Sequence, residues 1–181
     1  GLVRTFQATT VFTAQTVREN TLRGAYLTRH PGFLGSMFGG AAAREKRARS
    51  EALVSEVLDW LGLSAVAGVT AGNLPYGFQK TLGMAIALAA KPRMVMMDEP
   101  VAGLSAEEAD HVRDTIKKVR DRGITVMVID HNMRFISGLC DRVLVMHQGR
   151  QLAVGLPREV LSNPLVVEAS LGKSHAAAHD S

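Results

Sequence analysis

The chain has 181 residues, of which 46% are hydrophobic and only 5% aromatic, and it carries a net charge of +4. This composition suits one domain with a core of aliphatic and methionine side chains, and the mild basic excess permits an acidic partner without requiring one. Cys140 is the only cysteine, which excludes an internal disulfide and a cysteine-based metal site and fits a reducing compartment. No run of about 18 uncharged apolar residues is present, so no segment is expected to span a membrane.

The chain opens with the pattern of a strand followed by a helix. Residues 1–7 predict a strand, and because no helix, cap or signal sequence comes before it, we expect the domain to begin upstream of Gly1. Thr16 and Glu19 have the Thr-x-x-Glu spacing of a capping box, which predicts the start of a helix. Residues 30–43 are Gly-rich and aperiodic, and they predict an irregular insertion.

Two further helices are predicted in the middle of the chain. Residues 44–61 predict a half-buried helix, polar all round at its start, whose later apolar residues share one face: Leu53, Val54, Val57, Leu58 and Leu61. The Gly, Asn and Pro residues of segment 71–77 predict a loop. Residues 77–90 predict a helix from their Ala, Leu and Met content, and Lys91–Pro92 ends it.

Residues 94–129 have the rhythm of a β-α-β unit. Its predicted elements are a strand at 94–97, a helix at 106–122 and a strand at 124–129. Such units make parallel strands that are buried on both faces, and ligands bind just beyond the carboxyl ends of the strands. Residues 143–155 then predict a hairpin that turns near Gln148–Gly149, followed by a short helix at 157–164 and a frayed tail.

Two adjacent acids follow the first strand of this unit, at the edge where a ligand is expected. An Asp followed by a Glu divides two tasks that phosphoryl transfer to water requires, because one carboxylate holds Mg²⁺ and the other activates or orients the water. Asp98 suits the first task and Glu99 the second. The alternative reading is structural, since apolar runs that end in acids also occur where helices begin.

Two further segments carry weaker signals of phosphate binding. His131 follows the second strand, so its imidazole would reach the same edge of the sheet and could donate a hydrogen bond to a terminal phosphate oxygen. Residues 74–80, LPYGFQK, form a loop that enters the N-terminus of a helix, where free backbone amides and the helix dipole favour an anion. Each signal is weak alone, because a single His is more often structural and Gly-containing loops before helices are common.

Four segments, taken in order, resemble the motifs of one family. TFQ (5–7), LPYGFQK (74–80), MVMMDEPVAGLS (94–105) and VMVIDHN (126–132) resemble the Q-loop, the signature motif, the Walker B motif with the D-loop, and the H-loop of the ABC transporter ATPases. Their order and spacing are highly specific, and the resemblance covers nearly the whole chain. The form of the signature, with DEPVAGLS, is most similar to the ATP-binding subunits of branched-chain amino acid importers, with urea or amide importers as near relatives.

The resemblance implies a role for each matching residue, with ATP and Mg²⁺ as cofactors. Gln7 would contact Mg²⁺ and sense the membrane subunits, Asp98 would bind Mg²⁺, Glu99 would be the catalytic base, and His131 would be the switch histidine. The residues that would contact the ATP held by the opposite subunit are Leu74, Pro75, Tyr76, Gly77, Phe78, Gln79, Gly103, Leu104 and Ser105.

This chain departs from the family's pattern at three of its positions. Pro75 stands where the common signature has Ser, so the Gly77 backbone amide would carry more of the phosphate contact. Ser105 stands where an Asp often closes the D-loop, and with Glu108 it makes a Ser-x-x-Glu capping box, which favours helix capping as its role. Ile86 stands where many relatives have Arg in the signature helix, which puts a salt bridge from that helix in doubt.

An ATPase of this type also needs a Gly-x-x-x-x-Gly-Lys-[Ser/Thr] loop between a strand and a helix. No such loop is present in the 181 residues, because Gly172–Ser174 has Val167 where the first Gly belongs and no strand before it. In the family this loop lies upstream of the Q-loop glutamine. We therefore expect the chain to be the C-terminal portion of a longer ATPase domain, to bind ATP weakly or not at all alone, and to leave an apolar sheet edge uncovered.

The expected fold is α/β, a partial P-loop NTPase domain of the ABC ATPase type with a mostly parallel sheet and an inserted helical subdomain. The expected divisions are the first strand and Q-loop (1–15), the helical subdomain with the signature (16–90), the core half with Walker B, D-loop and H-loop (91–172), and a disordered tail (173–181). The expected partners are a second ATP-binding subunit, in a homodimer or heterodimer, and membrane permeases, with no nucleic acid. The expected location is peripheral, on the cytoplasmic face of the inner membrane.

Two other function classes remain open. One is a non-transport ABC ATPase that acts on nucleic acid or ribosomes and uses the basic segment 44–49, REKRAR, as its contact, although a charge run where a helix begins is usually a solvated face. The other is a catalytically inactive interaction fragment, which the absent phosphate loop suggests for this chain as it stands. The remaining features favour structural roles: Cys140 is expected to be buried and inert, and the expected core includes Trp60 and the methionines at 84, 94, 96, 97 and 127.

Overall fold

The computed structural model describes residues 2–5, 11–27 and 41–169. The chain divides into two compact units, Gly1–Ile129 and Asp130–Ser181. The elements of the first unit are β1 (Leu2–Thr5), α1 (Val17–Leu27), α3 (Ala41–Trp60), two short 3-10 helices (Ser64–Val66 and Ala71–Asn73), α4 (Tyr76–Ala89), β2 (Met94–Asp98), α5 (Ala106–Asp121) and β3 (Thr125–Ile129). The elements of the second unit are α6 (Met133–Ser137), β4 (Val143–His147), β5 (Arg150–Gly155) and α7 (Pro157–Leu161).

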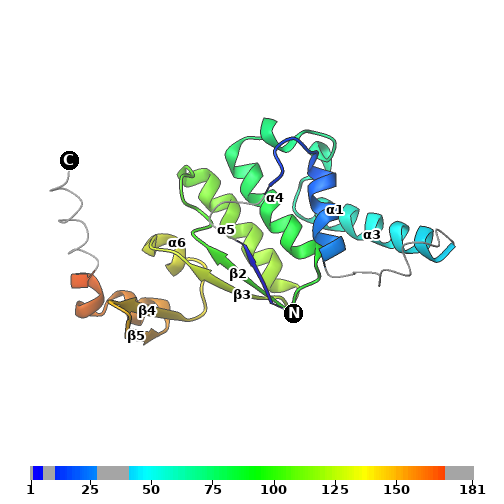
Figure 1. Ribbon diagram of the computed structural model, residues 1–181. Helices are drawn as coiled ribbons and strands as arrows, with labels where there is room; N and C mark the ends of the chain where they lie inside the picture. Colours follow the sequence, from blue (N-terminus) through cyan, green and yellow to red (C-terminus); the bar gives the residue numbers. More distant parts are fainter. Residues whose placement is uncertain (1, 6–10, 28–40, 170–181) are drawn as a thin grey trace. The chain divides into compact units, whose positions relative to one another are not determined.

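The first unit is built on a parallel sheet in the order β1-β2-β3. Figure 1 shows these strands side by side, with α4 and α5 lying along the sheet. Val3 pairs with Val95, and Asp98 pairs with Ile129 at the carboxyl ends of β2 and β3. The predicted β-α-β unit is therefore confirmed, and so is the position of Asp98 at the end of a parallel strand.

The two faces of this sheet differ in their exposure. Val95 and Met97 are 0% and 1% exposed, and they lie on the face that packs against the helices. The large hydrophobic residues of the opposite face that stay exposed among those described are Leu2, Met127 and Ile129, at 61%, 41% and 43%. The expectation that both faces are buried is therefore wrong for the described residues, and Met127 is not a core residue. A run of consecutive hydrophobic residues is expected both for a strand buried on two faces and for a strand buried on one. The sequence pattern of β3 could therefore not show which of the two applies.

The helix α1 begins where its capping box predicts. The Thr16 N–H and hydroxyl both donate to the Glu19 carboxylate, at 2.8 and 2.9 Å, and the Glu19 N–H donates back to the Thr16 hydroxyl at 3.2 Å. Farther along α1, Gly24 lies against α4, and a Cβ on Gly24 would lie only 2.0 Å from the Ile86 carbonyl oxygen. The absence of a side chain at Gly24 therefore allows the backbones of α1 and α4 to approach closely.

The helix α3 is longer than the sequence predicts. It begins at Ala41, inside the segment expected to be an irregular insertion, and residues 28–40 lie outside the described residues. Most of the predicted apolar face is confirmed, because Val54, Val57, Leu58 and Leu61 are buried, while Leu53 is half-buried. Trp60 is only half-buried, and the Arg122 guanidinium lies 4.1 Å from the centre of its ring, so Trp60 covers the surface rather than filling the core.

The second unit contains the predicted hairpin of β4 and β5, which pair antiparallel. Gln148 and Gly149 form its turn, with φ angles of 48° and 76°, which is the left-handed pair that a two-residue hairpin requires. The helix α7 packs on both strands, and Val160 is buried there. The short helix α6 has no counterpart in the predicted elements, and the tail predicted to be disordered lies outside the described residues from residue 170 onward.

Candidate functional site

The candidate site begins at the turn that follows β2. Asp98 is the last residue of the strand, and the Glu99 N–H donates to the Ile129 carbonyl at 2.8 Å, so β3 fixes the Glu99 backbone directly. Glu99 has a φ of 45°, in the left-handed region that residues other than glycine rarely adopt. Such strained backbones cluster at functional sites, because the surrounding structure must hold them in place. The residue types of this segment do not predict the turn.

The acids at this turn fit a magnesium ion bound together with a nucleotide. Asp98 and Glu99 are half-buried at the carboxyl edge of the parallel sheet, where ligands bind in α/β folds. Among the described residues, no three His, Cys, Asp or Glu side chains gather in a cluster that could hold a metal ion. Mg²⁺ does not need such a cluster, because one or two carboxylates suffice when phosphate and water oxygens complete the coordination.

The segment after Glu99 forms a tight connection to α5. The Ala102 N–H donates to the Glu99 carbonyl at 3.2 Å, and Gly103 takes a φ of 76°. Ser105 then caps α5, since its hydroxyl accepts from the Glu108 N–H at 3.2 Å while the Glu108 carboxylate accepts from the Ser105 N–H at 2.9 Å. The predicted capping box of Ser105 and Glu108 is confirmed.

The segment expected to bind an anion lies at the N-terminus of α4. Pro75 is the N-cap of this helix and makes no capping hydrogen bond through its side chain. Leu74 is buried, and its carbonyl accepts from Gln79 Nε2 at 3.0 Å, so Gln79 fastens the loop to the first turn. Tyr76 and Phe78 are 48% and 40% exposed, which leaves two aromatic rings on the surface beside the expected anion site.

The structure brings this helix N-terminus against the segment that follows β2. A Cβ on Gly103 would lie 3.4 Å from the Tyr76 ring, and a Cβ on Gly77 would lie 3.1 Å from Glu108 Oε1. Segments about 30 residues apart in sequence therefore meet within the first unit, as expected if both contact one ligand. Sequence reasoning found Glu108 only as a capping residue and missed its position beside Gly77.

The site residues nearer to the chain's N-terminus are described only in part. Gln7 lies outside the described residues. Residues 12–16 are held by Asn20, which is 0% exposed and whose amide group makes hydrogen bonds to the backbones of Phe12, Gln15 and Thr16. Sequence reasoning missed Asn20, although a polar residue on the inner face of an amphipathic helix is a signal worth reading.

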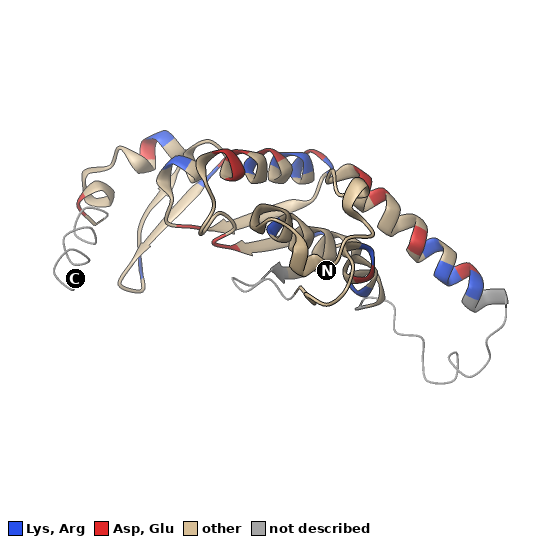
Figure 2. Ribbon diagram, turned by 90° about the horizontal axis from the view of Figure 1, so that it is seen from above, with Lys and Arg blue, Asp and Glu red and all other residues tan. Residues whose placement is uncertain are grey.

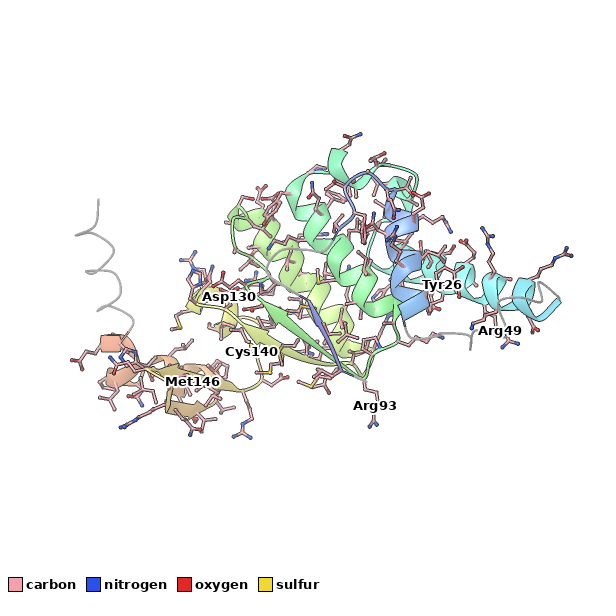
Figure 3. All side chains as sticks on the ribbon, viewed as in Figure 1. Tyr26, Arg49, Arg93, Asp130, Cys140 and Met146 are labelled. Carbon is pink, nitrogen blue, oxygen red and sulfur yellow. The ribbon has the colours of Figure 1, made fainter. Side chains whose placement is uncertain are left out.

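His131 belongs to the second unit, where it is exposed. Its neighbours fix the local backbone, because Asp130 Oδ1 accepts from the Asn132 N–H at 2.8 Å and the Asn132 side chain caps α6 by accepting from the Phe135 N–H at 3.0 Å. Figure 3 labels Asp130 at the start of this connection. The role of His131 beside the acids of the first unit stays a prediction.

Two other features have structural explanations. The basic start of α3 carries Glu45 as well as arginines, and Arg49 pairs with Glu45 one turn away. Figure 2 shows the two signs of charge interspersed along α3, and Figure 3 shows Arg49 pointing away from the helix, which is typical of a solvated face. Cys140 is half-buried, and burial, with a smaller effect from Asp141, raises the pKa of its thiol above the ordinary value, so the reactive thiolate is disfavoured.

Among the described residues, no helix is both long enough and apolar enough to span a bilayer.

Comparison with known proteins agrees with the motifs of the site. A family model described as "ABC transporter" matches residues 1–102. The chain is 37% identical over 177 residues to the "High-affinity branched-chain amino acid transport ATP-binding protein LivG" of Salmonella typhimurium, covering 96% of this chain and 69% of that protein. It is 34% identical over 175 residues to the corresponding BraF protein of Pseudomonas aeruginosa, with the same coverage.

Solved structures with the same fold are also ATP-binding cassettes. An ATP-binding cassette of an ABC transporter in its ADP conformation superimposes with a TM-score of 0.78 at 30% identity, covering 95% of this chain and 68% of that chain. A nucleotide-free ATP-binding cassette from an ABC transporter gives a TM-score of 0.77 at 29% identity, with coverages of 93% and 68%. The chain therefore belongs to the ABC transporter family and has the fold of its ATPase cassettes.

Proposed function

We propose that this chain is an ATP-binding and ATP-hydrolysing subunit of an ABC importer for branched-chain or similar small amino acids. The names of the two relatives support the substrate class, because both are branched-chain amino acid transport proteins. The observation that carries the enzymatic part is the left-handed turn at Glu99, which directly follows the strand-terminal Asp98 and is fixed by the end of β3. The backbone hydrogen bond to β3 holds the Glu99 carboxylate at the ligand edge of a parallel sheet, where a base for hydrolysis is needed.

The proposed roles divide among the chain's own residues. Asp98 and Gln7 hold Mg²⁺, which neutralises phosphate charge when it is bound. Glu99 accepts a proton from the attacking water, and His131 donates a hydrogen bond to the terminal phosphate. The Gly77 backbone amide, at the N-terminus of α4, contacts the phosphate of ATP held by a second subunit. The other residues proposed to line that contact are Leu74, Pro75, Tyr76, Phe78, Gln79, Gly103, Leu104 and Ser105.

The proposed partners follow from the same assignment. A second ATP-binding subunit, identical or related, supplies the opposite half of each ATP site. ATP hydrolysis by the pair of subunits drives the membrane permeases. Gln7 and the helical region 16–90 form the face coupled to the permeases, while residues 91–172 carry the chemistry. The assembly would place the chain peripherally on the cytoplasmic face of the inner membrane.

The test is Glu99→Gln in the transporter assembled in lipid vesicles, with ATP hydrolysis and uptake of labelled leucine measured in parallel. Removing the general base should lower turnover by at least about 100-fold while ATP binding persists. Glu107→Gln is the matched control, because Glu107 is exposed on α5 and has no assigned role. An unchanged rate of ATP hydrolysis in Glu99→Gln would reject Glu99 as the general base. If branched-chain amino acids neither stimulate ATP hydrolysis nor are taken up while it proceeds, the proposed substrate class is rejected.

A further inference from the structure

Asn20 and the loop before α4 share one hydrogen-bond acceptor. The Gln15 carbonyl accepts from Asn20 Nδ2 at 3.3 Å and from the Ala71 N–H at 2.8 Å, which the two lone pairs of a carbonyl oxygen allow. Asn20 and Ala71 are both 0% exposed. Two buried groups that lie about 50 residues apart in sequence are therefore joined through a single atom.

From Ala71 the hydrogen bonds continue without a gap to the start of α4. The Ala71 carbonyl accepts from the Leu74 N–H at 3.2 Å, and the Leu74 carbonyl accepts from Gln79 Nε2 at 3.0 Å. Leu74 is buried, at 6% exposed. Every step from Asn20 to Gln79 is thus a direct hydrogen bond or a single residue, and the path ends in the segment that resembles the signature motif.

A second contact joins the same two segments. The Gly72 N–H donates to the Thr13 carbonyl at 2.9 Å, and a Cβ on Gly72 would lie only 3.1 Å from that oxygen. Thr13 follows Phe12, whose backbone N–H and carbonyl both bond to the Asn20 side chain. Asn20 therefore fixes segment 12–16 on one side, and this segment holds residues 71 and 72 on the other.

We propose that Asn20 is a positioning residue for the start of α4. This inference rests on the proposed function, in which residues 74–79 contact ATP held by a second subunit. Asn20 does not touch the nucleotide, and it acts through the Thr13 and Gln15 carbonyls, which set where the loop before α4 places its backbone. Small displacements matter there, because hydrogen bonds weaken steeply when their distance or angle departs from the optimum.

The test uses Gly72→Ala in the transporter assembled in lipid vesicles, with the rate of ATP hydrolysis measured over a range of ATP concentrations. The added methyl group must push the Thr13 carbonyl away, which loosens the connection and leaves Asn20 in place. Gly68→Ala is the matched control in the same loop, because a Cβ there has no atom within 4 Å and the backbone needs no positive φ.

Gly72→Ala should raise the KM for ATP about fivefold, the effect of losing about one hydrogen bond. Its kcat should change less than about twofold, because the ATP contact is made both before and during hydrolysis. Gly68→Ala should change neither constant. A second variant, Asn20→Asp, removes the donor to the Gln15 carbonyl and should raise the KM at least as much as Gly72→Ala.

A purely structural role of Asn20 predicts a different result. Partial unfolding lowers the number of active molecules, so it lowers the apparent kcat and leaves the KM of the molecules that stay folded unchanged. A KM equal to that of the wild type in both Gly72→Ala and Asn20→Asp would therefore overturn the positioning role. An equal rise of the KM in Gly68→Ala would overturn it as well, because any change in the loop would then have the same effect.

Gly77→Asp separates this inference from the proposed function, because it places a negative charge where the phosphate is expected. If Gly77→Asp abolishes hydrolysis while Gly72→Ala and Asn20→Asp keep the wild-type KM, only the role of Asn20 fails. If Gly77→Asp leaves hydrolysis unchanged, the ATP contact in the proposed function fails, and the positioning role fails with it.

Discussion

Asn20 holds the backbone of Phe12 from both sides. Asn20 Oδ1 accepts from the Phe12 N–H at 2.8 Å, and Asn20 Nδ2 donates to the Phe12 carbonyl at 3.0 Å. The same Nδ2 lies within hydrogen-bond distance of the carbonyls of Gln15 and Thr16, at 3.3 and 2.9 Å. A single fully buried amide group therefore ties together the two ends of segment 12–16, whose Thr13 and Gln15 carbonyls also accept from the Gly72 and Ala71 N–H groups.

Replacing Asn20 with Asp should destabilise the protein by about 3 kcal/mol, because it removes the donor and faces a buried carboxylate with carbonyl oxygens. Urea unfolding measures the change. Asn73→Asp is the control, since Asn73 is exposed, and it should shift the midpoint little. If Asn20→Asp and Asn73→Asp lower the free energy of unfolding equally, the hydrogen bonds of Asn20 are not what holds segment 12–16.

Gly24→Ala should destabilise the contact between α1 and α4. The added methyl group would lie 2.0 Å from the Ile86 carbonyl oxygen, so the two helices must move apart, and such overpacking costs about 3 kcal/mol. Gly68→Ala is the matched control, because a Cβ there has no atom within 4 Å and the backbone needs no positive φ. If thermal unfolding shows Gly24→Ala to be as stable as Gly68→Ala, the close approach of the helices is wrong.

The two capping boxes should make stability depend on pH. The Thr16 N–H, then the Thr16 hydroxyl, and Arg23 hold the pKa of Glu19 below 4.5, as Ser105 does for Glu108. Because both pKa values are lower in the folded state, the carboxylates stabilise the fold above the unfolded value and lose this effect as the pH falls through the folded values.

On acidification from about pH 6 to about pH 3, the wild-type urea midpoint should therefore fall more than that of the double variant Glu19→Gln, Glu108→Gln. The double variant keeps both capping boxes, because Gln can occupy the same position. Parallel pH profiles for the two proteins would contradict a contribution from these carboxylates.

The exposed sheet face should make the 181-residue chain self-associate. Met127 is 41% exposed there, so Met127→Lys should reduce light scattering and the binding of a hydrophobic dye with little loss of folded structure. Met97, on the neighbouring strand, is 1% exposed and faces the helices, so Met97→Lys should unfold the chain. If Met127→Lys changes neither the light scattering nor the binding of the hydrophobic dye, the exposed face of the sheet does not drive self-association.

The sequence predicted local features better than contacts between distant segments. The box at Thr16 and the turn at Gln148–Gly149 are confirmed because each depends on residues a few positions apart. The position of Asp98 followed from the parallel arrangement of a β-α-β unit. The sequence could not predict the exposure of Met127, because the pattern of a buried strand does not show which segments cover it.

The contacts that sharpen the site were also beyond sequence reasoning. The left-handed turn at Glu99 is imposed by β3 through a backbone hydrogen bond, and nothing in the residue types requires it. The position of Glu108 beside Gly77 depends on how α4 packs against α5. Both features come from tertiary packing, which local propensities and spacing do not specify.

The bond between the Glu99 N–H and the Ile129 carbonyl makes the site sensitive to the length of the chain between α5 and β3. A one-residue deletion at Gly123 would slide β3 by one position, turn its outward side chains inward, and take the Ile129 carbonyl away from Glu99. An insertion of two residues at the Gln148–Gly149 turn would only lengthen a hairpin tip. Natural length variation should therefore be common at the hairpin and rare at Gly123.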